Sequence, residues 1–265
     1  MTTTLTAPHF LDLQDAETVW TGPFRLVRRL VADCQKDFGL CVVHGVAGLG
    51  KTYATRCALA DLATIPVITA TFPARTTQKL IAHTLLNKLT GDPGSGNIFR
   101  LQDQLIEELS ENPTLLYIDE AQRLGGHLIE FLRSIYDEDS TQLAIILAGG
   151  NRCWEILSRE AMLCSRVHRR VEFLPWSEAD TIRNVRAFHP IFRGSDDELI
   201  LYVNRMFGHG NFRQWANFTK TAVDICNAND RSVVDTDIAK NAFCLLSGGA
   251  HVNTAVPQPR PTTPG

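Results

Sequence analysis

The run from Gly45 to Thr52 contains the residues whose types and spacing are best suited to chemistry. Its letters, GVAGLGKT, follow the pattern G-x-x-x-x-G-K-T, which is typical of a loop that binds phosphate. Glycines let backbone N–H groups approach an anion closely, because no side chain stands in the way. We expect an ATP phosphate site made of Gly45, Val46, Ala47, Gly48, Leu49, Gly50, Lys51 and Thr52.

Two residues at the end of this loop have more specific expected roles. The Lys51 ammonium is expected to bind the β- and γ-phosphates, and the Thr52 hydroxyl to bind Mg²⁺. The flanking segments support this interpretation, because an apolar run that is typical of a buried strand precedes the loop and a helical pattern follows it. The alternative is a glycine-rich turn that binds nothing.

An apolar segment that ends in two acids, LLYIDE at residues 115–120, is the second chemical feature. A carboxylate at the C-terminal edge of such a strand, beside the phosphate loop, can hold Mg²⁺ through its waters. We expect Asp119 to take that role and Glu120 to act as the base that orients the attacking water. By itself this Walker B pattern is often only a strand end, but the preceding loop favours the site.

Three later residues are candidates for sensing or stabilising the phosphates. Asn151 follows the fourth apolar strand and is expected beside the γ-phosphate, although it also fits a simple turn. Arg166 lies in a basic run before the fifth strand, from which an arginine can reach a neighbouring subunit's site; Arg169, Arg170 or a solvated turn are the alternatives. Arg213 begins a helix and is expected to fold back over the phosphates, or else to lie on the surface.

The segments that must position these residues alternate between strand and helix patterns. Strands are predicted at 38–44, 65–71, 114–119, 142–148 and 171–174, with helices within 16–37 and at 53–62, 77–89, 98–110, 128–136 and 152–163. Strands separated by helices imply parallel pairing, so the predicted class is an α/β domain with a parallel sheet. Beyond Pro175 only helices are predicted, at 178–189, 196–207, 211–228 and 236–246.

These patterns predict four parts of the chain. We expect a flexible lead-in at 1–15, an α/β nucleotide-binding domain at 16–175, a small all-helical lid domain at 176–246 and a disordered tail at 247–265. The tail is rich in glycine, proline and threonine, which cannot bury enough apolar surface to fold.

Composition limits the classes of function. The formal net charge is −3, so a nucleic-acid site must be a local basic patch. The seven cysteines include no C-x-x-C pair, which disfavours a zinc site and favours a reducing compartment. The N-terminus lacks a signal-peptide pattern and no apolar run reaches membrane-spanning length, so we expect a soluble cytoplasmic protein that does not bind membranes.

With these motifs in place, the chain resembles the AAA+ ATPases. Within them it is most similar to the transposition-helper group, which includes phage Mu B-like proteins and the target-selection ATPases of Tn-type transposons. The segments that carry the resemblance lie between about Val42 and Ala222 and read VVHGVAGLGKT, LLYIDEAQRLGGHLIEFLR, LAIILAGGN, LCSRV and GNFRQWANFTKTA.

The resemblance implies a function as well as a fold. It implies a Mg²⁺-dependent ATP hydrolase that uses the residues named above, and a homo-oligomer, either a ring or a helical filament, on double-stranded DNA. It further implies a regulator of DNA transposition that selects target DNA and recruits or activates a DDE-type transposase, with a targeting protein as a further partner.

The expected DNA contacts also come from the resemblance. Phage Mu B-like proteins carry a helix-turn-helix domain, whereas only about forty residues precede the phosphate loop here. In the family that the chain resembles, DNA is held by short elements of the α/β domain, and the resemblance implies the same arrangement here. The candidates, each equally consistent with a solvated surface residue, are Arg75, Thr76, Thr77, Lys79, Arg123 and His127.

Two other functions remain open at this point. One is a different AAA+ switch, such as a helicase loader or a secretion-associated ATPase. The other is a small-molecule P-loop enzyme such as a kinase, which the arginine candidates and the helical domain disfavour because a kinase needs no subunit-bridging arginine.

Overall fold

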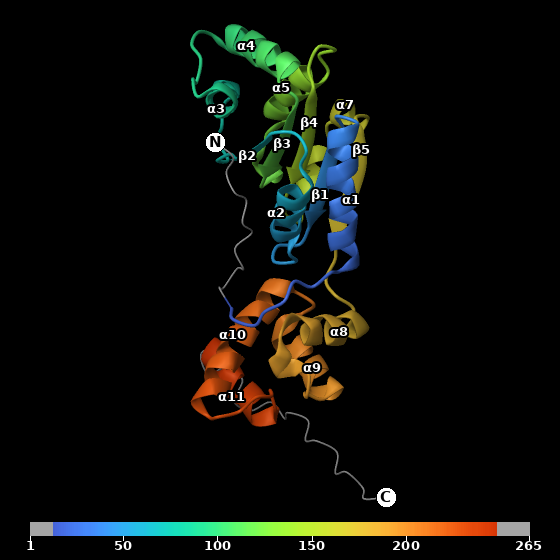
Figure 1. Cartoon of the computed structure of the whole chain (residues 1–265), viewed down its shortest axis with the longest axis vertical. Helices are drawn as coiled ribbons and strands as arrows, with labels where there is room; N and C mark the ends of the chain where they lie inside the picture. The colour runs from blue at the N-terminus through green and yellow to red at the C-terminus, as the bar shows by residue number, and fades with distance from the viewer. Residues whose placement is uncertain (1–12, 248–265) are drawn as a thin grey trace, which may run out of the picture. The chain divides into compact units, whose positions relative to one another are not determined.

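The computed structural model describes residues 13–247, which form two compact units (Figure 1). Unit 1 comprises Gly22–Phe173, and unit 2 comprises residues 13–21 together with 174–247. Each unit has its own hydrophobic core. Most of the predicted lead-in and all but one residue of the predicted tail lie outside the described residues.

The five strands of unit 1 form one parallel sheet in the order β2-β3-β4-β1-β5, which confirms the predicted α/β class. Strand β4 lies between β1 and β3, so the carboxyl ends of these three strands are neighbours at one edge of the sheet. The strands are β1 (Leu40–Gly45), β2 (Val67–Thr71), β3 (Thr114–Asp119), β4 (Leu143–Ala148) and β5 (Val167–Phe173).

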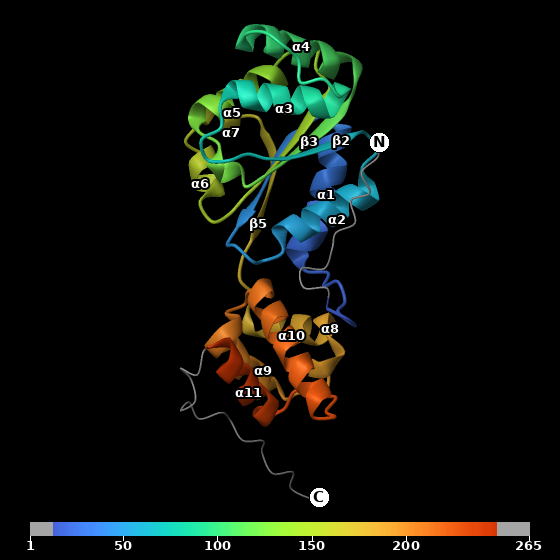
Figure 2. The same ribbon diagram turned by 90° about the vertical axis from the view of Figure 1, so that its left-hand side faces the viewer.

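Helices cover both faces of this sheet (Figure 2). One face packs against α1 (Gly22–Lys36) and α2 (Lys51–Leu62), and the other packs against α3, α4 and α5. Strands that are buried on both faces read as nearly continuous apolar runs, as β3 and β4 do. The remaining elements of the unit are α3 (Gln78–Thr90), α4 (Ile98–Glu111), a 3₁₀ turn η1 (Ala121–Arg123), α5 (Gly126–Tyr136), α6 (Cys153–Leu157) and α7 (Ala161–Cys164).

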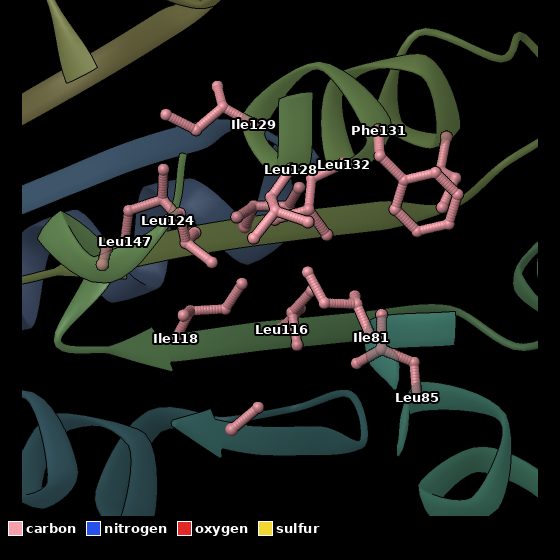
Figure 3. Packing of buried hydrophobic residues seen from close by; sticks show 14 of the residues in the cluster. Ile81, Leu85, Leu116, Ile118, Leu124, Leu128, Ile129, Phe131, Leu132 and Leu147 are labelled. Carbon is pink, nitrogen blue, oxygen red and sulfur yellow. The ribbon is translucent and has the colours of Figure 1, made fainter. Parts of the chain in front are cut away.

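The core between the sheet and α5 holds β3, the strand that ends in the acid pair. Leu116 and Ile118 of β3 belong to the same buried cluster as Leu128 and Leu132 of α5 (Figure 3). Burying one such side chain stabilises the fold by roughly 1.5–3 kcal/mol, so β3 is held firmly along its length. The acid pair that follows Ile118 therefore projects from a rigid strand end.

Unit 2 is helical within the residues described. Its helices are α8 (Glu178–Phe188), α9 (Asp197–Val203), α10 (Phe212–Ala228) and α11 (Thr236–Leu246), with a 3₁₀ turn η2 (Pro190–Phe192) and a π-helical turn η3 (Asn204–Gly208). Helix α10 carries the buried Trp215 and Phe218, against which Phe192 packs. No helix in the described part of the chain has the length and apolarity needed to cross a membrane.

His189 fastens the segment 13–21 to the helices of unit 2. The Ile191 N–H donates to His189 Nδ1 at 3.3 Å, so the proton lies on Nε2, which donates to the Gln14 carbonyl oxygen at 2.9 Å. Burial lowers the pKa of His189, which favours this neutral form. The segment is also bonded through its backbone, from Glu17 N–H to the Phe188 carbonyl oxygen at 2.8 Å.

Three predicted elements differ from the structure. The helix expected at 152–163 is two short helices, because Glu160 leaves the helical region with φ −89° and ψ 88°. Strand β5 begins at Val167 rather than at 171, so Arg169 and Arg170 lie in the strand, in register with Cys41 and Val42 of β1. An edge strand carries such charges readily, because it exposes one side to solvent. The helix expected at 196–207 ends at Val203 and continues as the π-helical turn.

Candidate functional site

The phosphate loop joins β1 to α2 through glycines in the left-handed region of backbone space. Gly45 has φ 137°, and a Cβ there would collide with the carbonyl oxygen of Phe173 at the end of β5. Gly50 has φ 91° but open space around it, so the backbone conformation rather than crowding requires glycine there. Glycine is thus required at Gly45 by the nearby end of β5 and at Gly50 by the backbone conformation of the loop.

The amino end of α2 is suited to an anion. Gly50 is the N-cap residue and supplies no side-chain cap, so the N–H groups of the first turn are oriented toward the loop. Lys51 is only 8% exposed, and its Nζ donates to the Val46 carbonyl oxygen at 2.7 Å. The ammonium is therefore folded back over the loop. A phosphate bound there could contact both the Lys51 ammonium and the N–H groups at the start of α2.

Thr52 and Asp119 meet at the edge of the sheet. The Thr52 hydroxyl donates to Asp119 Oδ2 at 3.1 Å, and the Glu120 N–H donates to Asp119 Oδ1 at 2.9 Å. A hydroxyl and a carboxylate are hard oxygen donors of the kind that Mg²⁺ uses together with substrate phosphates. These two residues, predicted from separate motifs, thus fit a shared magnesium site.

The backbone of Glu120 is unusual, since φ is 58° in a residue that is not glycine. This left-handed conformation costs on the order of 1 kcal/mol and turns the chain sharply into η1. Glu120 Oε2 accepts from Gln122 Nε2 at 2.8 Å and lies 3.3 Å from the Arg123 guanidinium. The carboxylate is therefore held at the strand end, half exposed.

Gln122 is a site residue that the sequence interpretation missed. It lies in the DEAQ stretch, but only the folded structure shows that its other end, Oε1, accepts from the Gly150 N–H at 2.9 Å. Asn151, the predicted phosphate sensor, is the next residue and is exposed at the end of β4. Because β4 lies between β1 and β3, the structure brings Asn151 to the same sheet edge as both motifs.

The three candidate finger arginines have partners within unit 1. Arg166 Nε donates to Asp137 Oδ1 at 2.8 Å, Arg169 Nε lies 2.8 Å from Asp33 Oδ2, and the Arg170 guanidinium lies 4.4 Å from the centre of the Trp154 ring. The Arg166 guanidinium holds the pKa of Asp137 below its ordinary value.

The sheet direction also determines where Arg166 lies. It immediately precedes β5, and in a parallel sheet the amino ends of the strands are at the edge opposite to the phosphate loop. Arg166 is therefore remote from the phosphate loop of its own chain, and a role in catalysis requires a second subunit.

Arg213 belongs to unit 2. It lies in the first turn of α10, where its N–H donates to Asn211 Oδ1, the N-cap, at 3.0 Å. The predicted helix start agrees with the structure to within one residue, and the role of Arg213 over the phosphates stays a prediction.

The predicted DNA contacts separate into two kinds. Thr76 is buried and its hydroxyl donates to the Pro73 carbonyl oxygen, whereas Thr77 caps α3 by accepting from the Leu80 N–H. Both threonines thus have structural roles of their own, which the sequence interpretation did not anticipate. Four cationic or ionisable side chains are exposed, namely Arg75, Lys79, Arg123 and His127.

These four exposed residues come from two segments that the fold brings together. Gln78 Nε2 donates to the His127 carbonyl oxygen at 3.0 Å, which joins the start of α3 to the start of α5. The exposed residues therefore lie on two adjoining segments, the start of α3 and the segment from η1 to the start of α5. The second segment follows Glu120 directly in the chain.

Comparison with known proteins supports the fold. Residues 34–157 match the family model of the AAA domain. No curated protein sequence matches the chain significantly. Similar solved structures include Drosophila ORC bound to DNA, with a TM-score of 0.67, 16% identity and coverage of 92% of this chain and 65% of that chain.

Two further structures extend the comparison. Cdc6p of Pyrobaculum aerophilum has a TM-score of 0.68 at 13% identity, covering 86% of this chain and 68% of that chain. The Holliday junction branch migration motor RuvB of Thermotoga maritima has a TM-score of 0.57 at 17% identity, covering 86% and 70%. This chain spans less than two thirds of the Drosophila ORC chain. The chain therefore has the AAA+ P-loop fold, with its AAA domain match over residues 34–157.

Proposed function

We propose that the chain is an AAA+ ATPase that assembles on duplex DNA when ATP is bound. The observation that carries the proposal is the meeting of Thr52, Asp119 and Glu120 at one edge of the sheet, beside the phosphate loop. A hydroxyl and a carboxylate for Mg²⁺, with a second carboxylate next to them, are the groups that phosphoryl transfer to water requires.

Each group has a definite task in this proposal. The loop N–H groups and Lys51 bind the β- and γ-phosphates, and Thr52 and Asp119 hold Mg²⁺, which neutralises phosphate charge when bound. Glu120 accepts a hydrogen bond from the attacking water and orients it, and Asn151 contacts the γ-phosphate. Residues 176–246 act as a lid on the nucleotide domain at 16–175, with Arg213 reporting the bound nucleotide.

DNA binding is assigned to Arg75, Lys79, Arg123 and His127 at the adjoining starts of α3 and α5. One subunit presents few cations and the chain has a net charge of −3, so a single subunit should bind weakly. A homo-oligomer, as a ring or a filament, aligns many equivalent patches along one duplex and raises avidity. The DNA in the Drosophila ORC structure supports the choice of ligand.

The biological role that we propose is regulation of DNA transposition in the cytoplasm. The oligomer would select target DNA and recruit or activate a DDE-type transposase, with a targeting protein as a further partner. The support is the order and spacing of the five motif segments, which resemble those of transposition-helper ATPases. The alternative is another AAA+ switch, such as a helicase loader or a secretion-associated ATPase.

The test is fluorescence anisotropy of a labelled duplex, titrated with protein plus a non-hydrolysable ATP analogue or ADP at two salt concentrations. We expect tight binding only with the ATP analogue, within a few-fold for different sequences, because phosphate contacts carry little sequence information. Affinity should fall steeply with salt, since each neutralised phosphate releases counterions. Equal, negligible binding in both nucleotide states, by protein that binds ATP, would contradict DNA binding.

A charge-matched pair of variants tests the assigned surface. Replacing Arg75 and Lys79 with alanine should flatten the salt dependence and spare nucleotide binding. Replacing Arg25 and Lys88, which are exposed elsewhere on unit 1, removes the same charge and should leave the salt dependence near wild type. The same effect in both double variants would show that net charge, rather than this surface, governs binding.

A further inference from the structure

We infer that Gln122 is a positioning residue for ATP hydrolysis, whose carboxamide ties the Glu120 carboxylate to the turn that follows β4. The inference rests on the proposed ATPase function and deepens it. Gln122 Nε2 donates to Glu120 Oε2 at 2.8 Å, and Gln122 Oε1 accepts from the Gly150 N–H at 2.9 Å. One side chain thus connects the carboxyl ends of β3 and β4, and both of its polar atoms are used.

The turn after β4 has the shape that this carboxamide needs. A Cβ at Gly149 would overlap Gln122 Oε1 and lie 2.6 Å from Cys153 Sγ, so only glycine leaves room for the amide. A Cβ at Gly150 would touch Gln122 Nε2 at 3.6 Å. Gly149 therefore leaves the space that the Gln122 carboxamide occupies, whereas Gly150 contributes through its N–H.

The geometry also distinguishes the two oxygens of the Glu120 carboxylate. Both neighbours, Gln122 and Arg123, contact Oε2. No residue in the described range 13–247 gives Oε1 a hydrogen bond, which leaves that oxygen for a water. The donor and the acceptor of a carboxamide are held in one rigid plane. The bond from the Gly150 N–H to Oε1 therefore also fixes the direction of Nε2, and through it which oxygen of the Glu120 carboxylate faces the reacting centre.

Gln122 therefore positions two parts of the proposed site. It orients Glu120 directly, and through the Gly150 N–H it fixes the residue before Asn151. A neutral amide does this without adding charge beside the carboxylate.

Two variants separate positioning from a merely structural role. Gln122→Met keeps the side-chain length and loses both hydrogen bonds, and we expect kcat to fall about 10- to 100-fold while nucleotide affinity changes by less than about 2-fold. Gln122→Glu keeps the side-chain shape but can no longer donate to Glu120 Oε2, so we expect kcat to fall here too, with nucleotide affinity again nearly unchanged. The matched control is Gln142→Met, at the amino end of β4, where the lost bond is to the Ser110 carbonyl oxygen.

Three kinetic outcomes would overturn the inference. They are an unchanged kcat in Gln122→Met, an unchanged kcat in Gln122→Glu, and a fall in nucleotide affinity as large as the fall in kcat. A comparable loss of kcat in Gln142→Met would show that the effect is general destabilisation. Since Gln122→Glu keeps the side-chain shape, it serves where Gln122→Met does not fold.

Amide hydrogen exchange of Gly150 tests the contact without any ATP hydrolysis. The Gly150 N–H should exchange faster in Gln122→Met and stay protected in Gln142→Met. Unchanged exchange would overturn the tie between Gln122 and the β4 turn even in an active ATPase. Conversely, wild-type protein that binds ATP, shows the protected amide and hydrolyses nothing would overturn the proposed function itself, and with it the catalytic role of Gln122.

Discussion

The Glu120 carboxylate combines a strained backbone with a fixed side chain. Its left-handed φ of 58° turns the chain out of β3, and Gln122 and Arg123 hold the oxygen that this turn presents. Such strain persists only where the surroundings determine it, and here β3 is buried on both faces up to Ile118. At the scale of single residues, binding and hydrolysis should therefore be separable.

Two substitutions test that separation. Glu120→Gln should leave ATP binding intact and slow hydrolysis by on the order of 10²-fold or more, because the water loses its orienting carboxylate. Lys51→Ala should weaken nucleotide binding itself, since it removes the ammonium that meets the phosphates. Steady-state hydrolysis and equilibrium nucleotide titration measure the two effects. Normal turnover by Glu120→Gln would refute the catalytic assignment.

At the scale of elements, the junction of β1 and α2 depends on contacts with β5 as well as on the loop itself. Gly45 passes beside the carbonyl oxygen of Phe173, whereas Gly50 begins α2 in open space. Both glycines have positive φ, but only at Gly45 would a Cβ also collide with a neighbouring strand, so their replacement should destabilise the fold by different amounts.

Alanine at these two positions should distinguish crowding from backbone strain. Gly45→Ala should lower the free energy of unfolding by about 3 kcal/mol, because its Cβ overlaps backbone that cannot move without shifting β5. Gly50→Ala should lower the free energy of unfolding by only about 1 kcal/mol, because alanine is disfavoured in the left-handed conformation. Urea unfolding followed by circular dichroism measures both values, and equal losses would contradict the close approach of β1 to the end of β5.

At the scale of the whole molecule, Arg166 connects the fold to assembly. It lies at the sheet edge opposite to the phosphate loop, and its Nε is bonded to Asp137. Within one chain this ion pair is accessible to solvent, and screening by water leaves it only a small contribution to stability. A catalytic effect of Arg166 should consequently appear only between subunits.

Mixing two inactive variants tests this arrangement. Arg166→Ala subunits should bind ATP and hydrolyse it poorly, and adding Lys51→Ala subunits should restore part of the activity, since one supplies an intact site and the other an intact arginine. Asp137→Asn breaks the same ion pair but keeps the arginine, so it should stay active. If the mixture remains inactive at every ratio although the subunits co-assemble, the site is not shared.

The sequence alone determined the features that depend on short-range pattern. The glycine loop, the acid pair after an apolar run and the alternation of strands and helices are each complete within a few residues, because backbone conformation and strand period are local properties. They were sufficient to predict the parallel α/β class and the residues around the phosphate loop. The helix start beside Arg213 was also predicted to within one residue, at 211 instead of Phe212, since a helix start has a local signature.

The tertiary structure decided the features that depend on distant segments. The Gln122 bond to Gly150, the Gln78 bond to His127 and the Arg166 bond to Asp137 join residues 28, 49 and 29 positions apart. Strand β5 begins at Val167, before the predicted start at 171, because it pairs with β1 there. The sequence of these residues taken alone indicated a basic turn. No local period encodes such pairings, since they arise from the packing of whole elements around the two faces of the sheet.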